Sequence, residues 1–178
     1  LEYVKILNPL SRELDTMRTS LMYGLLENVK YNQNRQNTSL KLFEFGKTYN
    51  KVNSKYNESR QLAFVLAGNK KTESWKYDNE SVDFYDIKGI CRNIKDKLGL
   101  HLKEKEAEKS PYFESSQKLV FKKQTVFEYG EVSEDIKRVI GFKGKIYIGI
   151  MNLEQVFALK DSSRISFKEL PKTFFVKR

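Results

Sequence analysis

The spacing of hydrophobic residues changes several times in the first part of the chain. Residues 3–7 predict a short strand, and residues 8–11 (Asn-Pro-Leu-Ser) then predict a turn, because Pro fixes φ and Asn tolerates turn geometry. Ser20 can cap a helix, which a polar run at residues 32–37 ends. The apolar residues of this helix, at helical spacing, are Leu21, Met22, Leu25, Leu26 and Val29.

Strand patterns follow this helix. Residues 40–49 alternate between apolar and polar side chains and predict a strand, whereas residues 50–57 are polar and predict a connector. Residues 62–67 form a continuous apolar run that ends at Gly68. A short run of this kind is typical of a central strand that is buried on both faces.

A loop and a second helix occupy the middle of the chain. Residues 69–81 predict the loop, which carries Trp75. Asp83 and Asp86 stand at the start of the helix, where negative charge is favourable, and Gly99 ends it. The apolar residues at helical spacing in this segment are Phe84, Ile87, Ile90, Cys91, Ile94 and Leu98.

The last part of the chain is predicted to contain mostly strands. The predicted strands are residues 100–106, 119–122, 126–132, 146–153 and 164–167, the second and third of which form a hairpin. Two short helices are predicted between them, at residues 133–140, which Ser133 can cap, and at residues 154–159.

This order of elements indicates the class of fold. It differs from the regular strand–helix alternation of a parallel sheet. We therefore expect an α+β fold with a mixed, largely antiparallel sheet and helices packed on one side. A length of 178 residues with 39% hydrophobic residues fits a single domain, residues 1–178, with its own core.

Composition and charge narrow the function. Lys and Arg total 33 and Asp and Glu 23, so the formal charge is 33 − 23 = +10, which suits an acidic partner or nucleic acid. The lysines are scattered, and none of the chain resembles a basic arm. Cys91 is the only cysteine, which excludes an internal disulfide and fits a reducing compartment. No signal peptide or membrane-spanning run is present, so we expect a cytoplasmic protein without membrane contact.

The residues that could carry chemistry are few. His101 is the only histidine and has no second histidine for a metal pair. Glycines at positions 141, 144 and 149 are too widely spaced for a phosphate-binding loop. Glu44 and Glu128 lie on predicted strands, and a carboxylate pair built from them would indicate an unrelated enzyme.

Several motifs occur in a fixed order in the first half of the chain. They are residues 8–11 (Asn-Pro-Leu-Ser), 17–21 (Met-Arg-Thr-Ser-Leu), 24–26 (Gly-Leu-Leu), 42–46 (Leu-Phe-Glu-Phe-Gly) and 82–89 (Val-Asp-Phe-Tyr-Asp-Ile-Lys-Gly), with Asn32, Arg35, Leu62, Ala63, Gly68 and Trp75 between them. At these spacings they resemble the β subunit of bacterial phenylalanyl-tRNA synthetase, in the region related to class II synthetase catalytic domains. The resemblance is dense in the first half and loose in the second.

The second half departs from the family pattern. The family's His-Pro-Gly segment is missing near residues 112–115, and Ser133 stands where a histidine is expected. Tyr23 replaces a proline of the family. Residues 170–172 and 177–178 are similar to the junction into a C-terminal anticodon-binding domain. The resemblance therefore implies an internal fragment of a longer β subunit.

The resemblance also implies a role. In the family, the α subunit of an α2β2 assembly makes phenylalanyl-adenylate from phenylalanine and ATP with Mg²⁺ and transfers phenylalanine to tRNA. The β domain is a degenerate copy of the catalytic domain that supports the α subunit. This segment itself would hold no cofactor and no metal ion.

The residues agree with such degeneration. An active class II site needs an arginine on its second-motif strand and another after a late strand, because fixed cations must meet the phosphate charge. Residues 43–47 and 148–155 carry no arginine. We therefore predict no catalytic residues in this segment.

Two functions remain open at this point besides the unrelated enzyme. The first is a non-catalytic domain that holds the α subunit, for which the predicted interface residues are Arg18, Leu21, Met22, Tyr23 and Trp75. The second is a stand-alone basic module that binds nucleic acid such as tRNA.

Overall fold

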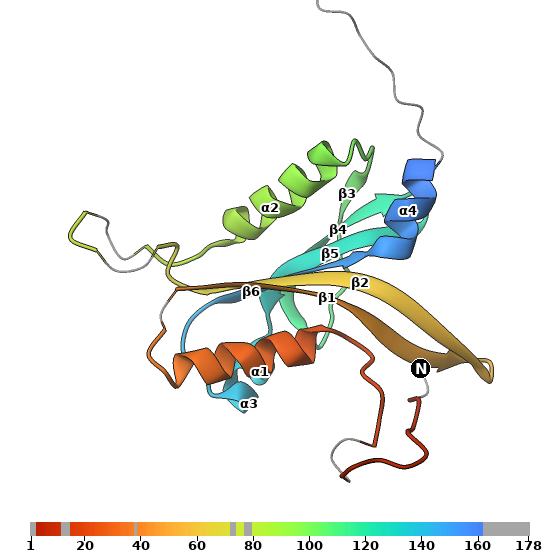
Figure 1. Ribbon diagram of the computed structural model, residues 1–178. Helices are drawn as coiled ribbons and strands as arrows, with labels where there is room; N and C mark the ends of the chain where they lie inside the picture. Colours follow the sequence, from red (N-terminus) through yellow and green to blue (C-terminus); the bar gives the residue numbers. More distant parts are fainter. Residues whose placement is uncertain (1–2, 12–14, 38, 72–73, 77–79, 162–178) are drawn as a thin grey trace, which may run out of the picture.

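Six strands and four helices make up the described part of the chain. The computed structural model describes residues 3–11, 15–37, 39–71, 74–76 and 80–161 (Figure 1). In chain order the elements are α1 (Met22–Gln33), β1 (Ser39–Val52), β2 (Lys55–Gly68), α2 (Phe84–Lys97), β3 (Lys103–Glu106), β4 (Phe113–Phe121), β5 (Gln124–Val132), α3 (Glu134–Ile140), β6 (Ile146–Asn152) and α4 (Leu153–Asp161).

The strands form one sheet in the order β1-β2-β6-β5-β4-β3. Every neighbouring pair is antiparallel. The prediction of a largely antiparallel sheet is confirmed, and no pair among the described strands makes the sheet mixed.

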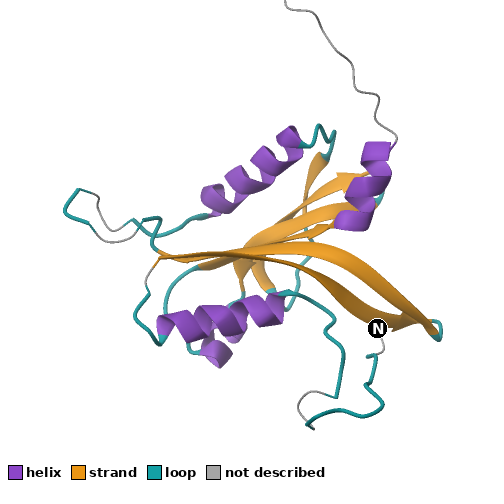
Figure 2. Cartoon of the chain, viewed as in Figure 1, coloured by secondary structure: helices purple, strands orange, loops and turns teal. Residues whose placement is uncertain are grey.

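Helices cover both faces of the sheet, as Figure 2 shows. α1 and α3 pack on one face, here called the α1 face, and α2 and α4 pack on the other, the α2 face. The expectation that the helices lie on one side is therefore wrong. The reason is that β2 and β6 present apolar side chains on both faces, and each face needs its own cover.

The double burial of β2 confirms the prediction for residues 62–67. Leu62, Phe64 and Leu66 pack beneath α2 and α4, in a core that includes Ile87 and Cys91. The alternate residues of the same run, Ala63, Val65 and Ala67, pack beneath α1. Successive side chains of a strand point to opposite faces, so one continuous apolar run supplies both cores. The buried thiol of Cys91 has a raised pKa because burial disfavours the thiolate.

The predicted polar connector at residues 50–57 is wrong. β1 and β2 continue through it and meet at a two-residue turn, in which Asn53 and Ser54 have φ values of 48° and 62°. Left-handed pairs of this kind match the twist of the strands that they join. An Asn-Ser pair is a weaker sequence signal for a hairpin turn than Asn-Gly. The residues on both sides of the pair are mostly polar, so they lack the apolar alternation by which strands are predicted.

Two local predictions also change, and a third is not tested. Residues 3–7 form no strand and make only one isolated bridge, between Lys5 and Thr16. Ser133 does not cap α3 with its side chain, because its hydroxyl donates to the carbonyl of Pro111 at 2.9 Å. The strand predicted at residues 164–167 lies outside the described residues, as do residues 170–172 and 177–178.

The cap of α2 agrees with the sequence, whereas the N-cap of α1 is Leu21, which makes no side-chain cap hydrogen bond, and Ser20 lies one residue before it. The hydroxyl of Ser20 accepts a hydrogen bond from the backbone N–H of Met22, at 3.1 Å, where α1 begins. Asp83 and Asp86 form a capping box at the start of α2, each side chain accepting from the other's backbone N–H. Gly99 follows α2 with φ of 65°, a conformation that glycine adopts without strain.

Gly149 of β6 should tolerate no side chain. A Cβ at this position would collide with the ring of Phe64 on β2, so we expect Gly149→Ala to lower the free energy of unfolding by about 1–3 kcal/mol. Gly89 inside α2 is the matched control, because nothing lies within 4 Å of its added Cβ. Gly89→Ala should raise the free energy by about 0.5–1 kcal/mol. Denaturant unfolding measures both, and equal effects would contradict this packing.

Candidate functional site

Two of the predicted interface residues lie in the core. Leu21 and Met22 are 1% and 3% exposed and pack between α1 and the sheet. Their side chains are therefore not available to a partner in this structure. The helical spacing of these residues in the sequence is that of a buried helix face, and the fold uses it for burial.

Arg18 joins the segment before α1 to strand β1. Its Nε donates to the carbonyl of Lys47 at 2.8 Å, and its Nη1 forms an ion pair with Glu44. The carbonyl of Arg18 in turn accepts from the backbone N–H of Tyr49 at 2.9 Å. Arg18 is half-exposed, but its charge is already matched by a carboxylate.

Tyr23 and Trp75 are exposed at different ends of the sheet. Tyr23, on α1, is 46% exposed, and burial together with a hydrogen bond to Tyr112 raises its pKa to about 12. Trp75 is 98% exposed in the loop between β2 and α2. This loop leaves β2 opposite Ser39, whereas Arg18 contacts Lys47, which is 47 − 39 = 8 residues along β1 and about 26 Å away. The structure therefore does not bring Trp75 together with Arg18 and Tyr23.

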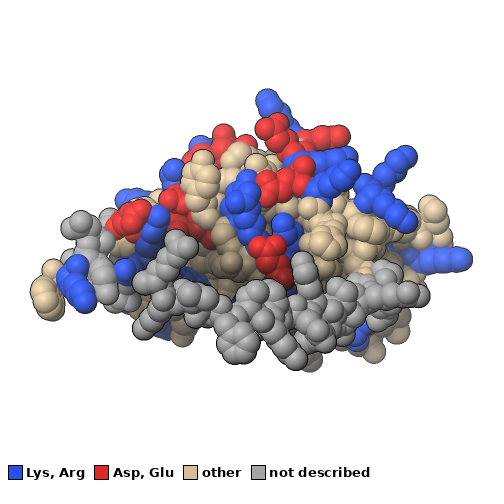
Figure 3. Space-filling model, turned by 90° about the horizontal axis from the view of Figure 1, so that it is seen from above, with Lys and Arg blue, Asp and Glu red and all other residues tan. Residues whose placement is uncertain are grey.

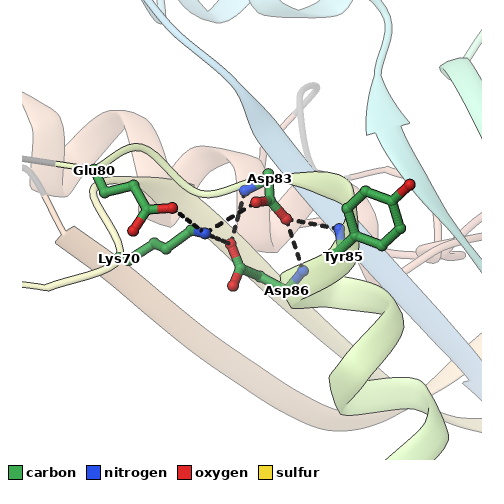
Figure 4. Close-up of polar contacts among 5 residues, drawn as sticks. All are labelled: Lys70, Glu80, Asp83, Tyr85 and Asp86. Carbon is green, nitrogen blue, oxygen red and sulfur yellow. Dashed lines mark hydrogen bonds and ion pairs between the residues drawn. The ribbon is translucent and has the colours of Figure 1, made fainter.

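Lys70 fixes the base of the Trp75 loop (Figure 4). Its Nζ lies 2.6 Å from Glu80, 2.9 Å from Asp83 and 3.4 Å from Asp86. The backbone N–H of Lys70 also donates to the carbonyl of Glu80 at 2.8 Å. One lysine thus ties the end of β2 to the N-terminus of α2. The Asp83–Asp86 spacing was visible in the sequence, but nothing in the sequence placed Lys70 beside it.

Charge neutralisation also characterises the α1 face of the sheet. Glu44 lies opposite Ala63, Ala63 opposite Ile150, and Ile150 opposite Glu128. The two carboxylates therefore share one row but are separated by three strand spacings, about 14 Å. Glu44 pairs with Arg18 and Glu128 with Lys118. This separation removes the hypothesis of an enzyme that uses Glu44 and Glu128 together.

The same face contains polar atoms without partners. Near the turn of the β1–β2 hairpin, Oδ1 of Asn50, Oγ of Ser59 and Oε1 of Gln61 are shielded from solvent and make no hydrogen bond. Buried polar atoms of this kind usually bind water. They offer hydrogen bonds but no charge.

Neither a metal-binding cluster nor a helix that could span a membrane occurs in the described part of the chain. Within it, no three His, Cys, Asp or Glu side chains gather where they could hold a metal ion. His101 lies exposed between α2 and β3. None of the described helices combines the length and the apolar character that a membrane span requires.

The cluster around Lys70 should make the stability of α2 depend on pH. The hydrogen bond from Lys70, followed by the N–H groups of Asp86 and Tyr85, holds the pKa of Asp83 below its ordinary value of 3.8. A lowered carboxyl pKa means that the stabilisation is present above the ordinary value and is lost as pH falls through the folded value.

We expect Asp83→Ala to lower the free energy of unfolding by about 1 kcal/mol at neutral pH, because α2 loses its cap. The difference from the parent chain should disappear in acid below the lowered pKa of Asp83. Asp96→Ala is the control, since this more exposed residue of α2 makes only a long contact with Lys95 at 3.5 Å. Denaturant titrations at neutral and acid pH measure the effect, and a pH-independent difference would contradict it.

Comparison with known proteins gives one consistent family. A family model described as "Phenylalanyl tRNA synthetase beta chain CLM domain" matches residues 1–153. The chain is 30% identical to the phenylalanine–tRNA ligase β subunit of Bacteroides thetaiotaomicron over 98% of its length, which is 23% of that protein. It is 33% identical to the same subunit of Protochlamydia amoebophila over 86% of its length, or 19% of that protein. The chain thus spans about a quarter or less of the length of these relatives.

Solved structures agree with the fold. The chain superposes on PylSc, a pyrrolysyl-tRNA synthetase of Desulfitobacterium hafniense, with a TM-score of 0.67 and 10% identity, covering 90% of this chain and 53% of that one. A second pyrrolysyl-tRNA synthetase structure from the same organism gives a TM-score of 0.62 and 11% identity, covering 83% and 51%. These similarities confirm the predicted class II synthetase-like fold.

Proposed function

Because the chain belongs to the phenylalanyl-tRNA synthetase β-chain family, we propose that it works as a synthetase-core-like domain of a phenylalanine–tRNA ligase β subunit. In this role it supports the α subunit, which attaches phenylalanine to tRNA(Phe) with ATP and Mg²⁺. The match of the family model over residues 1–153 is the observation that carries the proposal. The proposal places the protein in the cytoplasm, within an α2β2 ligase.

We further propose that this segment performs no adenylate chemistry. ATP activation needs fixed cations near the phosphates, since the developing charge must be met in a preorganised site. On the α1 face, the two basic side chains described above, Arg18 and Lys118, are each paired with a carboxylate. The β1–β2 hairpin closes in a two-residue turn, which leaves no long loop to fold over a nucleotide.

Nucleic-acid binding by the segment alone has less support. The formal charge of +10 favours it, but in the face shown in Figure 3 Lys and Arg are interspersed with Asp and Glu. Two ion pairs on the α2 face, Lys88–Glu104 and Arg92–Glu104, show how the positive charge is locally balanced. Such a mixed surface provides no continuous track for a phosphate backbone.

The proposed contact residues are those that the fold leaves accessible. Of the five predicted from the sequence, Arg18, Tyr23 and Trp75 remain candidates for contact with the α subunit, whereas Leu21 and Met22 pack the start of α1 against the sheet. Trp75 is the strongest of these, because a large exposed aromatic side chain on a fixed loop base is suited to fill a pocket on a partner.

The absence of adenylate chemistry can be tested by isothermal titration of the purified chain with ATP and Mg²⁺ and with phenylalanine. We expect no binding heat from either ligand, because Arg18 and Lys118 are already paired with carboxylates and so are not free to meet the phosphates. The assembled ligase, which should bind both, is the positive control. Micromolar binding of both ligands by the chain would overturn the proposal.

Contact with the α subunit can be tested by co-purification of the two full-length subunits. Trp75→Ala in the β subunit should weaken assembly by about tenfold or more if the indole is an interface anchor. Tyr85→Ala is the matched control, because Tyr85 is also a largely exposed aromatic residue, on α2. Failure of the parent subunits to co-purify would refute the proposed role itself. If both variants assembled equally well, Trp75 would be excluded as an interface anchor, and the proposed role would stand.

A further inference from the structure

The two edges of the sheet differ in their protection. β3 forms one edge and is only four residues long, Lys-Glu-Lys-Glu, all exposed and charged. Short, charged edges discourage the addition of another strand. β1 forms the opposite edge, is 14 residues long and carries Phe43 and Phe45 in exposed positions. The unprotected edge is therefore the β1 edge.

Arg18 covers one part of the β1 edge and leaves another open. The backbone N–H of Tyr49 and the carbonyl of Lys47 point away from β2 and bond to Arg18. β1 and β2 pair without a register shift, and the side to which the backbone groups point alternates from residue to residue. The N–H and C=O groups of Lys41, Phe43 and Phe45 therefore point outward as well. No hydrogen bond from the described residues closes them.

The open segment has an apolar groove on the α2 face. Phe43 and Phe45 are 69% and 63% exposed, and their rings meet edge to face at 6.0 Å between centroids. The groove measures about 350 Å³ and also includes Ile90 and Ile94 of α2. Exposed aromatic side chains beside such a groove are the usual mark of an interaction site.

A second, more polar groove lies on the α1 face of the same segment. It measures about 450 Å³ and lies between α1 and β1. Asn28 and Asn32 of α1 contribute polar groups to it, and Glu44 contributes a carboxylate. A strand added to β1 would alternate its side chains between these two grooves. The open backbone and both grooves thus suit the same ligand, an extended peptide.

We propose that residues 41–45 of β1 bind an extended segment of the partner subunit, which adds a strand to the sheet. The bound segment places apolar side chains beside Phe43, Phe45 and α2, and polar side chains beside Asn28 and Asn32. Backbone hydrogen bonds supply affinity, and the grooves supply specificity. This inference rests on the proposed function and names the surface through which the β domain holds its partner.

Charge favours a different chain over a second copy of this one. Each copy carries a formal charge of +10, so two copies repel one another. Lys41 lies beside the two phenylalanines on the same face of β1, where a second copy would bring a further lysine, whereas Lys47 is already paired with Glu58 at 2.7 Å. An acidic residue at the end of the incoming strand that lies beside Lys41 would meet this lysine favourably. The expected ligand is therefore a strand of apolar residues with an acidic residue at that end.

Hydrogen exchange of the full-length β subunit, alone and assembled with the α subunit, tests the proposal. The outward amides of residues 41, 43 and 45 should exchange rapidly in the β subunit alone. In the assembled enzyme their exchange should slow by about 100-fold, because the added strand accepts hydrogen bonds from them. The amides of β3 should not change and serve as the internal reference.

Substitution of the two phenylalanines provides an independent measurement. Phe43→Lys combined with Phe45→Lys should weaken assembly by about tenfold or more and remove the slowed exchange. Both side chains are mostly exposed, so the fold should persist, which circular dichroism checks. Tyr56→Lys is the matched control, because Tyr56 is an exposed aromatic residue of β2, 77% accessible and beyond the groove.

The outcomes separate the proposals. If the parent subunits do not assemble, the proposed function fails. If they assemble while residues 41–45 still exchange rapidly, or the double variant assembles like the parent, only this inference is overturned. Slow exchange without the α subunit also overturns it, because the strand then comes from the β polypeptide itself or, if the effect depends on concentration, from a second copy.

Discussion

The packing of residues 62–67 of β2 between two helical layers determines most of this structure. Alternate side chains of one strand enter two separate cores, so α1 and α2 must lie on opposite faces of the sheet. The antiparallel pairing of β2 with β1 on one side and β6 on the other then fixes the rows of residues across the sheet. Gly149 belongs to this arrangement, because the ring of Phe64 lies over it.

Electrostatic pairing supports the proposal that this synthetase-like fold performs no adenylate chemistry. Basic side chains are numerous, yet Arg18, Lys70 and Lys118 each face carboxylates. Lys70 acts as a structural tie between β2 and α2, and Arg18 as a tie between the segment before α1 and β1. In the proposed role these charges stabilise a surface and do not bind phosphates. A supporting domain needs that rigidity, since a partner binds most tightly to groups that are already ordered.

The edge of β1 gives the proposed supporting role a physical location. Segments far apart in sequence meet there: α1 supplies the wall of one groove, and α2 supplies the wall of the other. Arg18 closes the neighbouring part of the edge, so the open part is short and defined in register. An interface built in this way would use backbone hydrogen bonds, which tolerate changes of side chain, and it fits an identity of only 30% between this chain and its relative from Bacteroides thetaiotaomicron.

Local patterns in the sequence determined the identity of most elements, because helix and strand periods, caps and buried runs act over a few residues. Three local patterns each predicted their element correctly: the Asp83–Asp86 cap predicted α2, the helical spacing from Leu21 to Val29 predicted α1, and the apolar run at residues 62–67 predicted a buried strand. The ordered motifs likewise indicated the family. Only the tertiary structure decided that Leu21 and Met22 are buried, that helices cover both faces, and that Arg18 pairs with Glu44. It also extended the polar residues 50–57 into a hairpin and left the edge at Phe43 and Phe45 open. These features depend on contacts between residues distant in the chain, which no local spacing encodes.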